Sequence, residues 1–268
     1  MKIAAIQMVS GTGVQGNLDA ARELLEQAAS QGAELAVLPE YFCVMGMKDT
    51  DKLKVQEQAG SGLIQDFLSR SARELDLWIV GGTLPTATGN AGRARNSSLA
   101  YAPSGACVAR YDKMHLFRFV QGQEDHDETR VLDAGTQPVR FELASRDGHL
   151  YAVGLSVCYD LRFPELYRAL KADLLLVPSA FTYITGQAHW ELLLRARAIE
   201  NLAYVAAAAQ GGLHENGRRT WGHSMVIGPW GEILAEQAEG PGVVMGEVLG
   251  ARLQEVRQRL PALNHRVL

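Results

Sequence analysis

The chain has 268 residues, of which 47% are hydrophobic and 21% are charged, so it is long and apolar enough to bury a substantial core. Its net charge of −4 gives no basic surface of the kind that binds nucleic acid or an anionic membrane. No stretch approaches the roughly 18 apolar residues of a membrane span, so we expect a small-molecule partner, no nucleic acid and no membrane.

The cysteine content indicates a reducing compartment. Three cysteines, Cys43, Cys107 and Cys158, are an odd number and too few for a disulfide framework in a chain of this length. Free thiols persist where glutathione and thioredoxin keep them reduced. Residues 1–8 enter a strand-like segment without a long apolar signal core. We therefore expect a cytoplasmic protein.

Apolar strands alternate with amphipathic helices from the start of the chain. A strand over residues 3–8 precedes a helix over residues 17–31, whose apolar side chains recur every three or four positions, and a second strand covers residues 35–38. Asn17 is the predicted N-cap of this helix, and Gly32 is its predicted C-terminal cap. The alternation predicts an α/β fold.

The same pattern continues to the end of the chain. Further helices are predicted over residues 63–75, 164–171 and 188–201. Further strands are predicted over residues 77–83, 97–101, 107–111, 150–157, 174–177, 204–208, 225–227, 233–235 and 243–247. Residues 86–95 and 118–136 carry glycine, charge and turn residues and are predicted as surface loops. Because no linker divides the chain, we expect a single domain over residues 1–268.

Cys158 lies where an apolar strand runs straight into a turn and a helix. The strand over residues 150–157 ends just before it, and Pro164 lies where the first turn of a helix tolerates proline. A strand-turn-helix junction points a side chain out of the sheet and leaves backbone N–H groups free for a tetrahedral oxyanion. The thiol is therefore a candidate nucleophile, although a buried core thiol is the ordinary alternative.

Two charged residues also follow predicted strands. Glu40 ends the apolar run over residues 35–38, and Lys113 comes just after the strand over residues 107–111. Ligands of open α/β sheets gather outside the carboxyl ends of the strands, so Glu40 and Lys113 are expected to converge on Cys158. Taken singly, each would be interpreted as a solvated surface charge.

The segments around these three residues resemble a known family. Pro39-Glu40, the sequence YDKMHL from Tyr111 and the sequence GLSVCYDLRFPE from Gly154 are similar, in order and spacing, to the three signature regions of the carbon–nitrogen hydrolase (nitrilase) superfamily. The resemblance implies a four-layer α-β-β-α sandwich, an enzyme with no metal or organic cofactor, and a homodimer joined across a helical face.

The resemblance also implies a Glu-Lys-Cys triad, which falls on Glu40, Lys113 and Cys158. In this scheme Cys158 attacks an amide carbonyl and forms a thioester. Lys113 and the Tyr159 backbone N–H hold the oxyanion. Glu40 is the base, protonates the departing ammonia, and then activates water. A free thiol with a pKa of about 8.5 is only slightly ionised at neutral pH and needs such a base or cation.

Two downstream segments, residues 184–200 and 221–231, most resemble the Nit-type amidase branch, especially deaminated glutathione amidases. The implied reaction is the hydrolysis of a small linear carboxamide to a carboxylate and ammonia, with deaminated glutathione as the leading substrate. The alternative is an ω-amidase acting on 2-oxoglutaramate or 2-oxosuccinamate. A nitrilase or an N-carbamoyl hydrolase fits the segments less well.

Further site residues follow from these motifs. Many family members have a glutamate in the loop after the lysine, and Glu128 is the matching position, with a solvated acidic loop as the alternative. The acidic run over residues 124–128 contains one histidine and too few ligands to predict a metal. Arg162 and Tyr159, next to the thiol, and Phe181 and Thr182, after a strand, are the predicted substrate-binding residues.

Other arginines are given a structural interpretation. Arg195 and Arg197 lie two positions apart on a helix and point to different faces, so each is predicted to form an ion pair. Arg218 and Arg219 are predicted to lie in a solvated loop.

Two other classes of function are alternatives to hydrolysis. The sequence GTGVQG from Gly11 to Gly16 matches the glycine pattern of a dinucleotide-binding oxidoreductase, with Glu40 as the ribose-binding acid. Val9 and Ser10 separate the strand from Gly11, which weakens that match. A sandwich used only for assembly or partner binding would require disrupted catalytic positions, and all three are intact.

Overall fold

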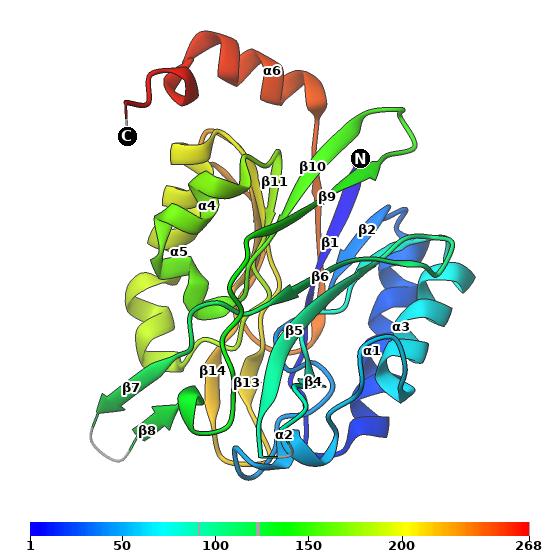
Figure 1. The fold of residues 1–268 in the computed structure, drawn as a ribbon. Coiled ribbons are helices and arrows are strands. Elements are labelled where there is room, and N and C mark those ends of the chain that lie inside the picture. The colour runs from blue at the N-terminus through cyan, green and yellow to red at the C-terminus, as the bar shows by residue number, and fades with distance from the viewer. Residues whose placement is uncertain (91, 122–123, 268) are drawn as a thin grey trace.

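The computed structural model describes residues 1–90, 92–121 and 124–267. Figure 1 shows two β-sheets packed face to face, with α1 and α3 covering one outer face and α4 and α5 covering the other. This arrangement is the predicted four-layer α-β-β-α sandwich.

The first sheet has the strand order β17-β1-β2-β3-β5-β4, and β6 also pairs with β5. Strands β1, β2 and β3 are parallel, so their carboxyl ends meet at one edge. The strands of this sheet are β1 (Lys2–Gln7), β2 (Leu35–Val37), β3 (Trp78–Val80), β4 (Leu84–Ala87), β5 (Ala94–Tyr101), β6 (Cys107–Asp112) and β17 (Gly242–Glu247).

The second sheet has the order β16-β15-β12-β11-β10-β9, with β10, β11 and β12 parallel. Its strands are β9 (Val139–Ala144), β10 (Leu150–Leu155), β11 (Leu174–Leu176), β12 (Tyr204–Ala207), β15 (Ser224–Ile227) and β16 (Ile233–Gln237). Two hairpins lie outside the sheets, formed by β7 (Arg118–Gln121) with β8 (Glu124–Asp127) and by β13 (Gly211–Leu213) with β14 (Arg219–Trp221).

The helices bury one apolar face each. In α1, for example, Leu18, Ala21, Leu25 and Ala28 are buried at helical spacing. The helices are α1 (Val14–Ser30), α2 (Asp51–Lys54), α3 (Leu63–Glu74), α4 (Pro164–Leu170), α5 (Tyr183–Asn201) and α6 (Gly250–Arg259), and the short 3-10 turns are η1 (Glu128–Arg130), η2 (Cys158–Arg162) and η3 (Ala262–Asn264).

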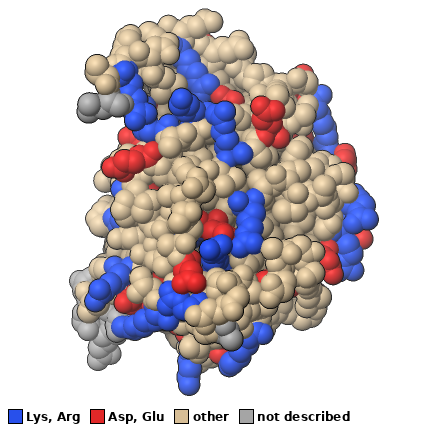
Figure 2. Space-filling model, in the orientation of Figure 1, with Lys and Arg blue, Asp and Glu red and all other residues tan. Residues whose placement is uncertain are grey.

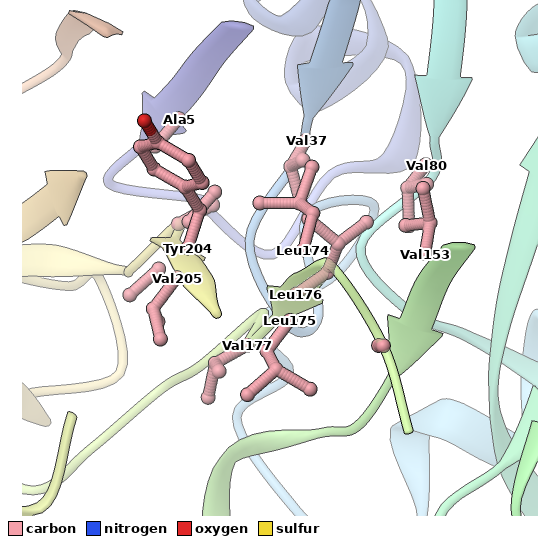
Figure 3. Packing of buried hydrophobic residues seen from close by; sticks show 14 of the residues in the cluster. Ala5, Val37, Val80, Val153, Leu174, Leu175, Leu176, Val177, Tyr204 and Val205 are labelled. Atoms are coloured by element: carbon pink, nitrogen blue, oxygen red, sulfur yellow. The ribbon is translucent and has the colours of Figure 1, made fainter. Parts of the chain in front are cut away.

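The strands place alternate side chains in two separate apolar layers. Ile3 and Ala5 of β1 point into the layer between the two sheets, whereas Ala4 and Ile6 join the layer under α1 and α3. In Figure 3, Ala5, Val37 and Val80 of the first sheet lie opposite Tyr204, Leu174 and Val153 of the second. This intersheet layer holds the two sheets, and hence the strand ends of both, in fixed register.

Several boundaries differ from the predictions. The first helix begins at Val14 with Gly13 as its N-cap; Asn17 is inside it, and its side chain bonds the Gly11 and Cys43 carbonyls. The predicted loop over residues 86–95 contains the end of β4 and the start of β5. The sequence did not predict β4 because this short edge strand includes Pro85 and has little β propensity. The strand β9 was missed, although its burial alternates with period two.

The predicted loop over residues 118–136 contains the hairpin β7–β8 and the turn η1. Both strands of this hairpin are only four residues long and have charged residues, so neither has the apolar alternation that predicts a strand. The polar helix α6 was missed for a similar reason, since only Leu253 and Val256 of it are buried.

Charged side chains of both signs lie on the surface. On the face drawn in Figure 2, acidic and basic side chains are interspersed. Within the described residues, no helix has the length and apolarity needed to cross a bilayer.

Candidate active site

Cys158 sits on a sharp turn between β10 and η2. Its φ of 51° is in the left-handed region, which a residue other than glycine adopts at a cost in energy. Its backbone N–H donates to the Pro178 carbonyl at 2.9 Å, which fixes the turn against the neighbouring strand. The next N–H, of Tyr159, has no hydrogen-bond acceptor among the residues the structure describes. The turn thus presents a thiol beside a free backbone donor.

Asp160 joins this turn to the segment that carries Lys113. The Asp160 carboxylate is fully buried and accepts hydrogen bonds from the Val157 N–H at 2.8 Å and the Tyr111 hydroxyl at 2.7 Å. It also accepts the backbone N–H of His115 at 3.1 Å. A buried carboxylate with this many donors is rigid, so Asp160 sets the distance between the two segments.

The Lys113 ammonium lies between two carboxylates. Its Nζ is 2.9 Å from Glu40 Oε1 and 2.8 Å from Glu128 Oε2, and only 1% of the side chain is exposed. An ammonium has three N–H donors. Two of them point to Glu40 and Glu128, so one is left for a further acceptor.

Glu40 follows β2 and is held by bonds from several elements. Asn96 Nδ2 donates to its Oε1 at 2.9 Å, and the Ala180 N–H donates to its Oε2 at 3.0 Å. The negative charge of Glu40 also acts on the Cys158 thiol, since it raises the pKa of that thiol, and both residues line the same pocket. The acid, the ammonium and the sulfur therefore meet in one place, as the convergence of strand ends predicts.

The electrostatics of the cluster set which groups carry charge. Burial raises the pKa of the Cys158 thiol well above its ordinary value, the charge of Glu40 raises it further, and Lys113 offsets only part of this. Burial alone would lower the pKa of Lys113, but the charges of Glu128 and Glu40 outweigh it and raise the pKa well above its ordinary value. The resting site thus holds a neutral thiol beside a charged ammonium.

Glu128 is charged in spite of its burial. Burial by itself would raise the pKa of Glu128, but the charges of Lys113 and Lys52 lower it to about 2. Its oxygens accept hydrogen bonds from the Tyr41 hydroxyl at 2.7 Å and the Phe117 N–H at 2.7 Å. The alternative of a solvated acidic loop is therefore wrong at this position, since Glu128 is built into the cluster.

These groups open into a pocket of about 530 Å³. All eight residues predicted for the site line it, namely Glu40, Lys113, Glu128, Cys158, Tyr159, Arg162, Phe181 and Thr182. The Arg162 guanidinium lies 5.8 Å from the ring centres of both Tyr159 and Phe181. Thr182 is also the N-cap of α5, where its hydroxyl accepts from the Thr185 N–H.

The pocket also contains residues that the sequence did not single out. Tyr41, Lys52 and Arg218 line it. Arg218 lies in the loop between β13 and β14, as predicted, but it is half-buried and not fully solvated. Lys52 belongs to a helix of four residues, and Arg218 to a hairpin turn, so neither follows a strand or a motif. The one feature of the sequence that could have indicated Lys52 and Arg218 is a positive charge in a segment without a predicted helix or strand.

The other arginines take structural roles, as predicted. Arg195 pairs with Glu191 at 2.9 Å and donates to the Gly231 carbonyl. Arg197 pairs with Glu200 at 3.0 Å and donates to the Leu161 carbonyl. Neither lines the pocket.

The described side chains of the acidic run over residues 124–128 have partners within the protein. Among the described residues, no group of three His, Cys, Asp or Glu side chains is arranged to hold an ion. Glu128 is committed to Lys113, and Asp127 accepts the Thr129 N–H as the N-cap of η1. The side chains of residues 124 and 125 lie outside the described part.

The glycine pattern near the N-terminus does not form an anion site. The Thr12 N–H and hydroxyl both donate to the carboxylate of Glu215, at 2.9 and 2.7 Å. A Cβ on Gly11 would lie 2.9 Å from an oxygen of that carboxylate. A pyrophosphate placed here would meet a negative charge instead of free N–H groups, which argues against the oxidoreductase alternative.

Comparison with known proteins agrees with this arrangement. The family model described as carbon-nitrogen hydrolase matches residues 2–258. The chain is 45% identical over 269 residues to a deaminated glutathione amidase of Synechocystis sp., which covers 98% of this chain and 97% of that protein. It is similar to the crystal structure of the C. elegans NitFhit protein, with a TM-score of 0.88 and 35% identity, over 99% of this chain and 65% of that one.

A third similar protein is an amidase from Nesterenkonia sp. AN1, with a TM-score of 0.78 and 27% identity over 100% of this chain and 97% of that one. The structure is of a mutant that shows covalent addition of the acetamide moiety of fluoroacetamide at the active site cysteine.

Proposed function

The chain belongs to the carbon-nitrogen hydrolase family and is an amidase, and we propose that it cleaves a small linear amide through a thioester on Cys158. The observation that carries the proposal is that Glu40, Lys113 and Cys158 line one pocket, with the Lys113 ammonium 2.9 Å from the Glu40 carboxylate. A nucleophile, a base and a cation in one pocket are what acyl transfer requires.

In the first half of the reaction, the sulfur attacks the amide carbonyl while its proton passes to Glu40. The oxyanion is held by the remaining N–H of Lys113 and the backbone N–H of Tyr159. The carbon–nitrogen bond then breaks, and Glu40 gives its proton to the departing amine. Cys158 is left as a thioester.

In the second half, Glu40 takes a proton from water, and the hydroxide attacks the thioester. The same two donors hold the second oxyanion. The carbon–sulfur bond breaks, the acid leaves, and Glu40 passes its proton to the sulfur, which restores the thiol and the carboxylate. Glu128 acts as a positioning residue, because it holds Lys113 and Tyr41 in place without contact to the thiol.

We propose deaminated glutathione as the substrate, since the Synechocystis relative carries that name over nearly its whole length. Its scissile bond joins a 2-oxoglutaryl group to cysteinylglycine, so the amine released would be that dipeptide, and the expected release of ammonia is wrong for this substrate. With a primary amide such as 2-oxoglutaramate, the ω-amidase substrate, ammonia would leave instead. The chemistry at Cys158 is the same for both.

The proposal is tested by replacing the nucleophile. We expect Cys158→Ala to remain folded and to lose at least about 10⁴-fold in kcat, because no other thiol lies in the pocket lining that the structure describes. Wild-type protein mixed with substrate and quenched should carry an acyl group on the peptide that contains Cys158, detected by mass spectrometry.

Cys107→Ala is the matched control, since Cys107 is exposed and far from this chemistry. It should retain wild-type kcat. A folded Cys158→Ala protein with near wild-type turnover would refute the nucleophile. The relative kcat/KM for deaminated glutathione, 2-oxoglutaramate, a simple nitrile and an N-carbamoyl amino acid decides the substrate class, and a preference for the nitrile contradicts our assignment.

We further propose that residues 1–268 form a single domain, that the protein works in the cytoplasm, and that it is a homodimer. The free Cys43, Cys107 and Cys158 support the cytoplasm. The exposed Leu192 and Ile199, one heptad apart on one face of α5, support a dimer contact on that helix. Sedimentation should give twice the chain mass of 29.2 kDa.

A further inference from the structure

We propose that Lys52 and Arg218 form a binding site for a carboxylate of the substrate. The inference rests on the proposed amidase function and adds the chemical class of its substrate: an amide that also carries a carboxylate. Both cations line the pocket that contains Cys158, and they come from elements that play no part in the proposed chemistry.

Lys52 is a buried cation without a hydrogen-bond partner. Only 6% of the residue is exposed, yet its ammonium donates no hydrogen bond within the part of the chain that the structure describes. Its nearest acidic oxygen, on Asp49, is 3.8 Å away, and its Nζ lies 4.3 Å from the centre of the Tyr41 ring. A buried charge of this kind costs free energy unless a partner arrives, so the site is poised for an anion.

Arg218 lies close enough to Lys52 to repel it. Burial lowers the pKa of Lys52, and the charge of Arg218 lowers it further, although the charges of Glu128, Asp49 and Glu40 act in the opposite direction. Among the described residues, the sole hydrogen-bond partner of the Arg218 guanidinium is the Met45 sulfur, at 3.8 Å. Its five N–H donors are therefore nearly all available, and a guanidinium binds a carboxylate with two of them at once.

The hairpin turn that carries Arg218 is held in place before any ligand binds. His214 Nδ1 lies 2.9 Å from the Ser10 carbonyl oxygen, and Asn216 Nδ2 donates to the Gly46 carbonyl at 2.8 Å. Preorganisation of this kind reduces the entropy lost on binding.

Among the described residues, no carboxylate of the pocket accepts a hydrogen bond from the Lys52 ammonium or the Arg218 guanidinium, although Asp49 lies 3.8 Å from Lys52 and the charge of Glu128 raises the pKa of Lys52. Glu40 and Glu128 are shared with Lys113. Asp127 accepts from Thr129 at the start of η1, and the Asp49 side chain is 46% exposed. Lys52 and Arg218 thus keep N–H donors free for an anion from outside the chain.

Two carboxylates of deaminated glutathione fit this chemistry, one on the 2-oxoglutaryl group and one on the glycine. 2-Oxoglutaramate has only the first. Comparing the two ligands therefore shows which carboxylate binds. If the variants lose affinity for both ligands, the carboxylate of the 2-oxo acid lies at Lys52 and Arg218. If they lose affinity for deaminated glutathione alone, the carboxylate of the glycine lies there.

The test measures binding, so that it does not depend on turnover. Each ligand is titrated calorimetrically into Cys158→Ala, and into the same protein with Lys52→Met or Arg218→Gln. We expect each added change to weaken binding of at least one ligand about tenfold or more, the size of a lost charge-assisted hydrogen bond.

The neighbours Lys54 and Arg219 provide matched controls. Lys54 is on the same helix as Lys52 with 75% of its side chain exposed, and Arg219 pairs with Glu239 on the surface. Lys54→Met and Arg219→Gln should bind both ligands as the parent does. Should Lys52→Met fail to fold, Arg218→Gln decides the question.

Unchanged affinity in the folded variants, or no binding of either ligand by the parent, overturns the carboxylate site. The amidase proposal fails separately, if wild-type protein turns over no amide. Wild-type turnover together with normal binding by the Lys52 and Arg218 variants therefore removes this inference alone.

Discussion

At the scale of single residues, the charged Lys113 is not the group that activates the nucleophile, Cys158. The Lys113 ammonium is already committed to Glu40 and Glu128, so it does not keep Cys158 ionised. The thiol is buried and lies near the negative charge of Glu40, and both effects raise its pKa and so favour the neutral form. Attack by sulfur therefore depends on proton transfer to Glu40 during the step.

This arrangement predicts a thiol that stays protonated in the resting protein. A free cysteine is half ionised at about pH 8.5; Cys158 should show no thiolate ultraviolet absorbance at that pH, because burial raises its pKa. The signal is the difference between wild-type protein and Cys158→Ala. A titration midpoint below that of a free thiol would show that Lys113, and not Glu40, activates the sulfur.

Glu128 is predicted to matter for both activity and stability. Glu128→Gln keeps the size of the side chain and removes the charge opposite Lys113. We expect kcat to fall about tenfold or more with a smaller change in KM, because an ion pair that positions Lys113 is lost. Steady-state kinetics with 2-oxoglutaramate measure the effect, and an unchanged kcat contradicts the role.

The stability effect of Glu128 has a defined pH dependence. Its pKa is lowered from 4.5 to about 2, so its contribution is complete above pH 4.5 and is lost as the pH falls toward 2. The difference in unfolding free energy between wild type and Glu128→Gln should therefore shrink between about pH 5 and pH 3. Urea denaturation measures it, and a difference that grows on acidification would refute the pairing.

At the scale of elements, the turn between β3 and β4 supports the segment that carries Glu40. Gly82 has a φ of 47°, and a Cβ there would lie 2.0 Å from the Pro39 carbonyl oxygen. Only glycine fits, because both the backbone conformation and the space exclude a side chain. The turn thus fixes Pro39, next to the base.

Gly82→Ala should therefore impair folding and activity together. We expect a loss of stability well above about 1 kcal/mol, because the substitution is strained and also clashes with backbone. Gly89→Ala is the control, since Gly89 has a φ of 85° but open space around it, and should cost only about 1 kcal/mol. Thermal and urea unfolding compare them, and equal losses would show that the contact with Pro39 is unimportant.

At the scale of the whole molecule, the layer between the sheets holds the site together. Glu40 and Lys113 come from the first sheet, and Cys158 follows β10 of the second (Figure 1). Their distances depend on how the two sheets pack, and that packing rests on apolar side chains such as those in Figure 3. Damage to this layer should weaken stability before it changes the chemistry.

Two leucines of β10 test this. Leu155 is fully buried in the intersheet core, and Leu150, on the same strand, is 53% exposed. Leu155→Ala should lower the free energy of unfolding by about 2–5 kcal/mol, and Leu150→Ala by less than about 0.5 kcal/mol. Chemical denaturation measures both, and similar losses would mean that burial at Leu155 contributes little.

The sequence alone predicted the parts of this protein that depend on local order. Apolar periodicity predicted the helices α1, α3, α4 and α5 and most strands of the two sheets, because burying one face requires that spacing. Strand ends with Glu40, Lys113 and Cys158 gave the core of the site, because parallel strands converge at their carboxyl ends. Short or charged elements such as β4 and β8 were missed, since their pairing is stabilised by neighbours and not by their own pattern.

The tertiary structure alone decided what else surrounds the thiol. Lys52 and Arg218 lie 166 positions apart, on a short helix and a hairpin turn, and they meet only because bonds such as that from Asn216 to Gly46 hold these loops together. The pairing of Glu128 with Lys113, and the protonated state of Cys158, likewise depend on burial and on charges from several elements. Burial and electrostatic interactions depend on the distances between groups in space, and the spacing of residues along the chain does not determine those distances.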